Sequence, residues 1–339
     1  MDKQSHDALI IAEVGQNHQG ELDKAREYIR VFALAGADVI KFQTRNNKSL
    51  FSEEAYAMPY NSENAFAETY GAHREHLELK PEWLPILLAD CHQYGVRFMS
   101  TPFDDESLDL LCNIGVDMLK VASFDLGNLP FLDRMARTGK PIVMSTGGGT
   151  MRHIRASVDT LLQHNSSIML LHCVSEYPCE YDRLGLKKIQ TLAKEFPRCT
   201  IGLSDHFNGT LSGPIAYMLG ARVFEKHVTL NRAWKGTDHS FALESEGFRK
   251  FTRDIRRVSK MLPPVVDEEL GKEAVFKKLG KSLTARVDIA AGQPFDMNNL
   301  SGKIFTSQMV PVRATCDVLG RIAKRDIKAG EPLQPSDFE

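Results

Sequence analysis

The sequence has no long apolar run and no paired cysteine motif. No stretch reaches the roughly 20 apolar residues that a membrane-spanning helix requires, and the short apolar run near the N-terminus lacks the length and the cleavage site of a secretory signal. The six cysteines are scattered without a C-x-x-C pair, which excludes a cysteine-based metal cluster and argues against a disulfide framework. The formal net charge of −2 gives no reason to expect nucleic acid or an acidic membrane as a partner. We therefore expect a cytoplasmic protein with reduced thiols.

Short runs rich in β-branched residues alternate with longer amphipathic segments over the first three quarters of the chain. Eight such runs occur, at residues 8–15, 37–44, 96–103, 117–123, 141–149, 167–173, 200–205 and 221–228. Eight strand–helix units in this length predict a parallel α/β fold, a (β/α)₈ TIM barrel, over residues 1–262. A Pro-rich and charged stretch at 263–280 is predicted to be a linker. Residues 281–339 contain the similar phrases VDIAAGQPF and RDIKAGEPL and predict a small, turn-rich β domain.

Each predicted strand ends in polar residues, which a strand buried on both faces should avoid. In a barrel the carboxyl ends of the strands converge on one rim, where active sites lie. The polar ends include Glu13, Lys41, Gln43, Thr101, Lys120, Ser123, Ser145, His172, Ser204, His206, Glu225 and His227. A long segment, 46–80, separates the second and third strands. Its aromatic content favours an ordered, functional loop over the barrel mouth.

The sharpest signal is a pair of histidines, His206 and His227, in the phrases SDH and EKH at the ends of consecutive strands. Two imidazoles from adjacent strands could hold one divalent cation and leave positions open for water and substrate. Two structural histidines, each satisfied by backbone hydrogen bonds, explain the same pattern. The residues alone leave both interpretations open.

Lys41 and Lys120 each close a strand and are predicted to point into the same mouth. Two ammonium groups suit a phosphate or carboxylate ligand, with help from the hydroxyls of Thr101, Ser123 and Ser204. One lysine could instead form a Schiff base, as in aldolases on this fold. Both could also be lysines whose charged ends are simply solvated.

Three further residues carry groups suited to chemistry or to sugar binding. Glu13, in IAEVGQNH, could act as a general base or be neutralised by a lysine. Tyr177 and Asp238 lie in loops after the sixth and eighth strands, where they could bind sugar hydroxyls or an amide.

Several phrases in strand order resemble the sialic acid synthase family across nearly the whole chain. They are IIAEVGQNHQG, IKFQT, STPF, LKVAS, STG, LLHC, SEYP, IGLSDH, FEKHVTL and GTDHSFALE. The tail, residues 281–339, resembles the antifreeze-like SAF domain of that family. The resemblance implies a homodimer in which this domain swaps across and helps to close the partner's barrel.

The resemblance also implies a reaction, in which phosphoenolpyruvate condenses with an amino-sugar aldehyde to give a sialic-acid-type nonulosonic acid and phosphate. Lys41, Thr101, Lys120, Ser123, Ser175 and Ser204 would bind phosphoenolpyruvate, and Gln43, Tyr177 and Asp238 would bind the sugar. A Mn²⁺ or Mg²⁺ ion on His206 and His227 would polarise the aldehyde. Glu13 would steer or deprotonate the water that adds at carbon 2, so Glu13 and His227 are the expected catalytic residues.

The acceptor sugar stays open between N-acetylmannosamine, its 6-phosphate and a sugar of the pseudaminic or legionaminic type. Three other functions fit parts of the pattern: another 3-deoxy sugar acid synthase that uses phosphoenolpyruvate, a Schiff-base aldolase, and a carbohydrate- or ice-binding protein led by its C-terminal domain. The eight polar strand ends favour an enzyme over a binding protein.

Overall fold

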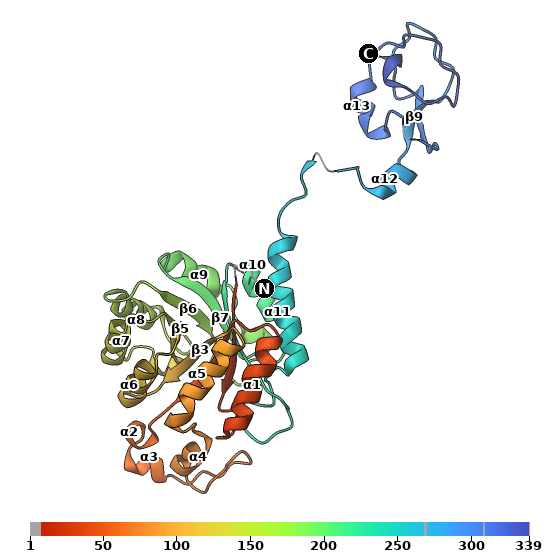
Figure 1. The fold of residues 1–339 in the computed structure, drawn as a ribbon. Coiled ribbons are helices and arrows are strands. Elements are labelled where there is room, and N and C mark those ends of the chain that lie inside the picture. Colours follow the sequence, from red (N-terminus) through yellow and green to blue (C-terminus); the bar gives the residue numbers. More distant parts are fainter. Residues whose placement is uncertain (1–7, 268–269, 308, 339) are drawn as a thin grey trace. The chain divides into compact units, whose positions relative to one another are not determined.

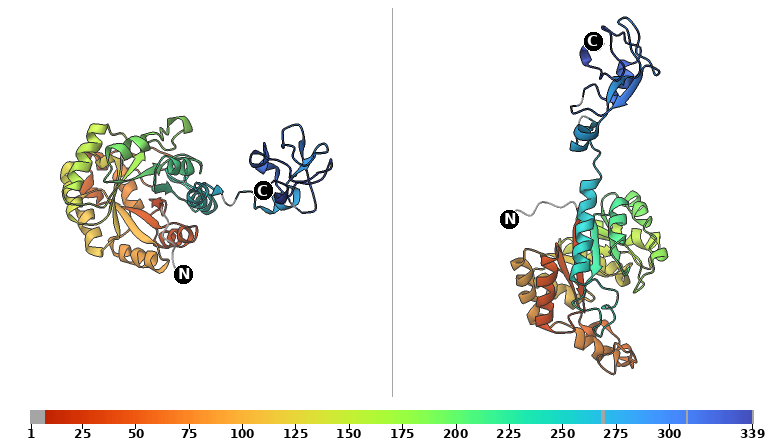
Figure 2. Two further views of the ribbon diagram at one scale, coloured as in Figure 1. Left: turned by 90° about the horizontal axis from the view of Figure 1, so that it is seen from above. Right: turned by 90° about the vertical axis from the view of Figure 1, so that its right-hand side faces the viewer.

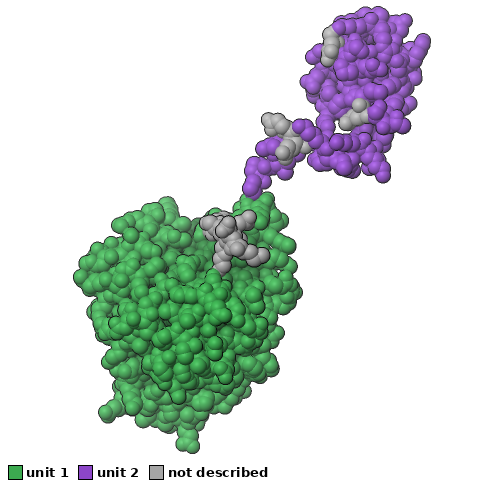
Figure 3. Space-filling model, viewed as in Figure 1, with its two compact units in different colours: residues 1–262 green, residues 263–339 purple. Residues whose placement is uncertain are grey.

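The computed structural model describes residues 8–267, 270–307 and 309–338. The chain divides into two compact units, residues 1–262 and residues 263–339 (Figure 3). Each unit has its own buried core, so each is described by itself.

The first unit is a closed barrel of eight parallel strands, each hydrogen-bonded to the next and the last to the first (Figure 1). The strands are β1 (Leu9–Gly15), β2 (Val39–Thr44), β3 (Arg97–Pro102), β4 (Met118–Val121), β5 (Ile142–Ser145), β6 (Ile168–Cys173), β7 (Thr200–Asp205) and β8 (Val223–His227). Helices surround them, as both views in Figure 2 show. The predicted (β/α)₈ barrel is confirmed.

The strands follow each predicted apolar run because their side chains alternate between two buried layers. Residues that face the barrel axis form one apolar cluster: Ile11, Val39, Met99, Met118, Val143, Leu171 and Val223. Their neighbours pack outward against the helices, as Phe224 does with Phe251 (ring centroids 6.5 Å apart). The apolar cluster fills the barrel interior, and polar residues begin above it, toward the carboxyl ends of the strands.

The outer layer consists of amphipathic helices that bury one face each. They are α1 (Leu22–Leu34), α5 (Leu84–Gln93), α6 (Asp105–Ile114), α7 (Leu129–Arg137), α8 (Met151–Leu162), α9 (Lys188–Glu195), α10 (Ser212–Met218) and α11 (Ser245–Met261). In α11 the buried residues are Phe248, Phe251, Thr252 and Ile255, the spacing of one helical face. Gly213 of α10 permits close contact, because a Cβ there would lie 2.5 Å from the Phe251 ring.

The segment between β2 and β3 is ordered, as its aromatic content suggested. It contains α2 (Asn47–Leu50), α3 (Glu53–Ala57) and α4 (Tyr70–Leu77). The ring of Tyr70 packs edge-on against Phe51 and Tyr60, with centroids 5.4 and 5.2 Å away. We call residues 46–80 the β2–β3 insertion.

The second unit is small and rich in turns. It contains α12 (Ala274–Leu279), α13 (Thr315–Val318) and an antiparallel pair of strands, β9 (Ser282–Ala285) and β10 (Leu300–Lys303). Helix α12 lies inside the range 263–280 that the sequence suggested as a linker. The two similar phrases pair with each other, because Ile289 and Ile327, at equivalent positions, exchange both backbone hydrogen bonds (2.9 and 2.8 Å).

Two properties of the whole chain bear on the expectations from composition. All six cysteines are free. Within the described residues, we find no helix with the length and apolar character needed to cross a membrane.

His18, in the turn after β1, makes barrel stability depend on pH. Its Nδ1 accepts a hydrogen bond from the backbone N–H of Gly20 (3.0 Å), and burial lowers the pKa of His18 to about 3. As the pH falls below 6.5, His18 becomes protonated in the unfolded chain but stays neutral in the folded chain. The free energy of unfolding therefore decreases as the pH falls toward 3. We expect His18 to lower the free energy of unfolding by about 2 kcal/mol between pH 6.5 and pH 5.

The measurement is urea unfolding of wild type and His18→Asn at pH 7 and pH 5. Asparagine keeps an acceptor for the Gly20 N–H but does not titrate. The free energy of unfolding of the variant should therefore fall less between the two pH values. An equal fall in both proteins would show that His18 is not the cause.

Candidate active site

A cavity of about 800 Å³ opens at the carboxyl ends of the strands. Most of the residues predicted for the site line it: Glu13, Lys41, Gln43, Thr101, Lys120, Ser123, Tyr177, Ser204, His206, His227 and Asp238. Strand register explains this convergence, because Glu13 on β1 pairs with both Lys41 on β2 and His227 on β8. The β2–β3 insertion contributes part of the wall through Leu50, Phe51, Asn64, Tyr70 and Arg74.

Ser175 is the predicted site residue that does not line this cavity. Ser175 is half-buried, and its Oγ is buried without a hydrogen-bond partner. Gly147, in the turn after β5, allows this position, because a Cβ there would lie 2.1 Å from Ser175 Oγ and 2.7 Å from Ser123 Oγ. Gly147 therefore brings the backbone close to the serines of the site, and its N–H donates to Ser123 Oγ (3.0 Å).

Lys41 lies at the centre of a buried charge cluster. Its Nζ is 2.6 Å from Glu13 Oε2 and 3.6 Å from Glu225 Oε2. Burial opposes the ammonium charge, but the two carboxylates outweigh it and raise the pKa of Lys41. Burial raises the pKa of Glu13, against the attraction of Lys41. Lys41 is therefore charged at neutral pH, and burial makes Glu13 more basic than an exposed glutamate.

Lys120 sits differently, among hydroxyl and carbonyl groups. Its Nζ donates to Ser145 Oγ (2.7 Å) and to the Val121 carbonyl (2.8 Å). Burial lowers the pKa of Lys120, although Glu225 opposes this. For Glu225 the order is reversed: burial disfavours its charge, but Lys120 and Lys41 prevail and lower its pKa to about 2. Lys41 and Lys120 thus both line the cavity, and both interact with the ionised Glu225 carboxylate.

His206 and His227 lie next to each other, with ring centroids 5.3 Å apart. The Nδ1 of His206 is 2.7 Å from the Val174 carbonyl, and burial would lower the pKa of His206, but its contacts with the Cys173 side chain and the Val174 carbonyl outweigh burial and raise that pKa. The Nδ1 of His227 is buried without a hydrogen-bond partner, and Asp238 Oδ2 is 3.6 Å away. Burial lowers the pKa of His227 to about 3, so its imidazole is neutral, the form that binds metals.

The outward neighbours of these histidines hold β7 and β8 together. Lys226 Nζ is 2.7 Å from Asp205 Oδ2, with both side chains fully buried, and Ser212 Oγ at the start of α10 donates to the same oxygen (2.5 Å). Such a pair keeps its geometry because separating buried charges is costly. It fixes the two strands from which the histidines project.

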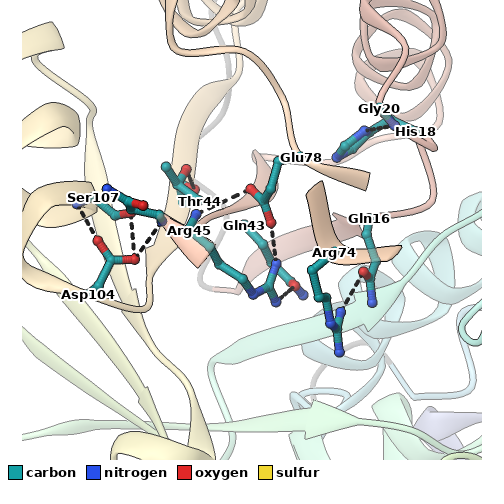
Figure 4. A network of polar contacts seen from close by, with 12 residues as sticks. Gln16, His18, Gly20, Gln43, Thr44, Arg45, Arg74, Glu78, Asp104 and Ser107 are labelled. Carbon is teal, nitrogen blue, oxygen red and sulfur yellow. Dashed lines mark hydrogen bonds and ion pairs between the residues drawn. The ribbon is translucent and has the colours of Figure 1, made fainter. Parts of the chain in front are cut away.

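A chain of polar contacts leads from Glu13 to the outer wall. Gln43 Nε2 donates to Glu13 Oε1 (2.8 Å), and Arg45 donates to the amide oxygen of Gln43. Arg45 is held in turn by Glu78, with Nη1 2.9 Å from Oε1 (Figure 4). The predicted sugar-binding residue Gln43 therefore has a fixed amide orientation.

The sequence did not assign roles to several residues that line the cavity. Glu225, Ser145 and Cys173 lie at strand ends. The pattern of polar strand ends could have identified Glu225 and Ser145 as candidate site residues. Arg45 directly follows β2, and Arg74 lies in the β2–β3 insertion. No sequence motif pointed to either residue.

Family models match both units. The model described as NeuB family matches residues 28–266, and that of the SAF domain matches residues 280–339. The chain belongs to the NeuB family. The family resemblance and the C-terminal SAF domain inferred from the sequence are therefore confirmed.

NeuB-family relatives align over most of the chain. The N-acetylneuraminate-9-phosphate synthase of Mus musculus is 34% identical over 335 residues, covering 98% of this chain and 93% of the relative. The N,N'-diacetyllegionaminic acid synthase of Campylobacter jejuni is 34% identical over 331 residues, covering 96% and 98%. The solved sialic acid synthetase of Leptospira borgpetersenii superposes with a TM-score of 0.69 at 32% identity, covering 77% of this chain and 89% of that one.

Proposed function

We propose that the protein condenses phosphoenolpyruvate with an amino-sugar aldehyde to give a sialic-acid-type nonulosonic acid and inorganic phosphate. The observation that carries this proposal is a single cavity lined by two buried lysines, a buried glutamate and two adjacent histidines. Relatives named for N-acetylneuraminate 9-phosphate, diacetyllegionaminic acid and pseudaminic acid support the reaction class. Their products differ in the sugar, so the acceptor has to be tested.

Phosphoenolpyruvate is proposed to bind at the lysines, because its phosphate and carboxylate need cations and hydroxyls. Lys41 and Lys120 supply the charge, and Thr101, Ser123 and Ser204 line the same cavity. Ser175, next to Gly147, would complete the set, with its unpaired Oγ as the available group. Gln43, Tyr177 and Asp238 are proposed to orient the sugar.

A divalent cation, Mn²⁺ or Mg²⁺, fits the histidine pair by its donor set. The neutral His227 ring with an unpaired Nδ1 and the adjacent His206 ring are two imidazole donors that line one cavity. No group of three or more His, Cys, Asp or Glu side chains is arranged for a metal in the part of the chain described, so water and substrate would fill the other positions. When bound, the cation would supply Lewis-acid polarisation of the aldehyde.

The residues around carbon 2 account for the rest of the reaction. Carbon 3 of phosphoenolpyruvate forms a bond to the aldehyde carbon, whose oxygen gains a proton, and carbon 2 becomes electron-poor. Glu13 accepts a proton from the water that adds there. The C–O bond to phosphate then breaks as carbon 2 becomes a ketone, and Lys41 and Lys120 stabilise the departing phosphate.

Phosphate release tests the proposal directly. Phosphoenolpyruvate would be supplied with Mn²⁺ and, in parallel, N-acetylmannosamine, its 6-phosphate or a diacetamido-trideoxyhexose, with an EDTA arm. We expect release that requires one of these sugars and the metal. Absence of release with all three sugars, from folded and metal-loaded protein, would contradict the proposal.

A second candidate, a Schiff-base aldolase that uses pyruvate, is favoured by the lowered pKa of Lys120, since a neutral amine is the nucleophile. Borohydride reduction with pyruvate would leave a covalent adduct on Lys120 or Lys41 in an aldolase. We expect no adduct, because the synthase reaction passes through no imine.

Two finer features belong to the same proposal. The free cysteines suit a reducing compartment such as the cytoplasm. We also propose a homodimer that exchanges its C-terminal units, since exposed Val275, Phe276 and Leu279 give that unit an apolar surface to cover. Sedimentation equilibrium of the full chain tests the dimer, and a monomer at micromolar concentration would contradict it.

A further inference from the structure

Four aromatic rings form a closed cluster at the ends of β7 and β8 and in the loops after β6 and β8. They belong to Tyr177, His206, His227 and Phe241, and the centroids of every pair of these rings lie between 4.1 and 6.4 Å apart. Tyr177 and the two histidines line the cavity, whereas Phe241 is 1% exposed and does not belong to its lining. Phe241 follows the predicted sugar-binding residue Asp238 by three positions, in the phrase GTDHSFALE. Its ring is therefore a buried apolar group packed against both proposed metal ligands.

The two histidines differ in what fixes their rings. A metal-binding imidazole is commonly oriented by a hydrogen bond at its other ring nitrogen. His206 has such a contact, because its Nδ1 is 2.7 Å from the Val174 carbonyl. Among the described residues, the Nδ1 of His227 has no hydrogen-bond partner, and Asp238 Oδ2 is 3.6 Å away. Packing therefore has to supply the orientation that this hydrogen bond would give.

Phe241 provides that packing. Of the aromatic rings around His227, the ring of Phe241 is the nearest, with centroids 5.1 Å apart and planes inclined by 61°. The planes of Phe241 and His206 are inclined by 87°, with centroids 6.4 Å apart. Rings inclined in this way pack edge to face, a geometry that restricts the rotation of each ring against the other. An aliphatic side chain has no ring face with which to fix the angle of an imidazole.

The chain on both sides of Phe241 is attached to the end of β8. Before it, His239 Nδ1 lies 2.8 Å from Thr229 Oγ1. After it, the Leu243 N–H donates to the His227 carbonyl, and the Thr229 N–H donates to the Leu243 carbonyl (both 2.9 Å). The segment that carries Phe241 is therefore bound to the same backbone as the histidine that its ring contacts. A ring held in this way can keep His227 in one orientation.

We infer that Phe241 is a positioning residue that orients the imidazole of His227 and so sets the affinity of the site for its divalent cation. This inference rests on the proposed function, which places the cation at His206 and His227. The ring of Phe241 has no polar atom, so it leaves the chemical step to other groups. Its removal should weaken metal binding and leave the binding of phosphoenolpyruvate, at Lys41 and Lys120, unchanged.

The test is the substitution Phe241→Leu, with free Mn²⁺ followed by electron paramagnetic resonance during titration of the protein. Loss of a supporting contact around a metal ligand predicts a Mn²⁺ affinity about tenfold lower than that of wild type. In steady-state kinetics, the Mn²⁺ concentration that gives half of the maximal rate should rise in parallel. Saturating Mn²⁺ should return kcat to within about threefold of wild type, with an unchanged KM for phosphoenolpyruvate.

The matched control is Phe248→Leu in α11. Phe248 is also fully buried, but its ring packs against Phe32 and Phe251 in the layer of helices. This variant should lose a similar free energy of unfolding in urea and keep the Mn²⁺ affinity of wild type. Phe241→Met, which also lacks a ring, replaces Phe241→Leu if the leucine variant does not fold.

The outcomes separate this inference from the function on which it rests. Wild-type Mn²⁺ affinity in folded Phe241→Leu, or an equal loss in Phe248→Leu, would overturn the role of Phe241 and leave the metal site intact. No Mn²⁺ binding by wild type would overturn both. A loss of affinity that is confined to Phe241→Leu, and whose effect on kcat is overcome by saturating Mn²⁺, supports the inference.

Discussion

Replacing His227 or His206 by alanine is expected to lower kcat by about 10³-fold, with little change in the KM for phosphoenolpyruvate. Polarisation of a carbonyl by a bound cation contributes several kcal/mol, and each 1.36 kcal/mol corresponds to a factor of ten. Phosphoenolpyruvate is bound mainly by Lys41 and Lys120, which these substitutions leave in place. Steady-state kinetics in saturating Mn²⁺ measure the effect.

Metal binding is measured separately, by electron paramagnetic resonance of free Mn²⁺ during titration of the protein. Wild type should remove one equivalent from solution, and each alanine variant should bind at least 100-fold more weakly. His164→Ala is the matched control, because His164 lies at the end of α8 with a third of its side chain exposed and is paired with Asp133. Full activity in both His206→Ala and His227→Ala would rule out the metal site.

The fold was predictable because each strand is buried on both faces and therefore appears in the sequence as an apolar run. The run 221–228 shows how far this goes: Val223 faces the barrel axis, Phe224 the helices, and Glu225 the cavity. A charged residue inside such a run has to lie at its end, where the cavity begins. The same logic located Lys41, Lys120 and His227 before their contacts were known.

Contacts between distant segments were not predictable from the run pattern. Arg45 and Glu78 are 33 positions apart and meet only because the β2–β3 insertion folds back on itself. The ion pair of Lys226 with the buried Asp205 could not be predicted either. In the alternation along β8, Lys226 faces outward, at a position that would suit an apolar residue. Arg74 contacts Gln16 and lines the cavity because distant parts of the chain come together, which short-range sequence patterns do not encode.

The substitution Glu13→Gln is expected to lower kcat by about 10²- to 10⁴-fold, the usual contribution of a positioned general base. Glutamine has the same shape and can still accept from Gln43 Nε2, but it takes no proton from water. Burial raises the pKa of Glu13, which makes it a stronger base than an exposed glutamate. Rapid-quench measurement of phosphate formation in a single turnover would show the slow step.

The competing role for Glu13 is to hold Lys41, and the kinetic parameters distinguish the two. If Glu13 only positions Lys41 for phosphoenolpyruvate, Glu13→Gln should raise the KM for phosphoenolpyruvate while kcat is kept. Glu225→Gln is the matched comparison, because Glu225 also lies beside Lys41 but at a longer distance, 3.6 Å against 2.6 Å. If Glu13 is the general base, only Glu13→Gln should lower kcat. If both glutamates act as electrostatic partners of Lys41, both variants should raise the KM for phosphoenolpyruvate. Loss of kcat in Glu13→Gln with an unchanged KM for phosphoenolpyruvate would therefore assign the proton transfer to this carboxylate.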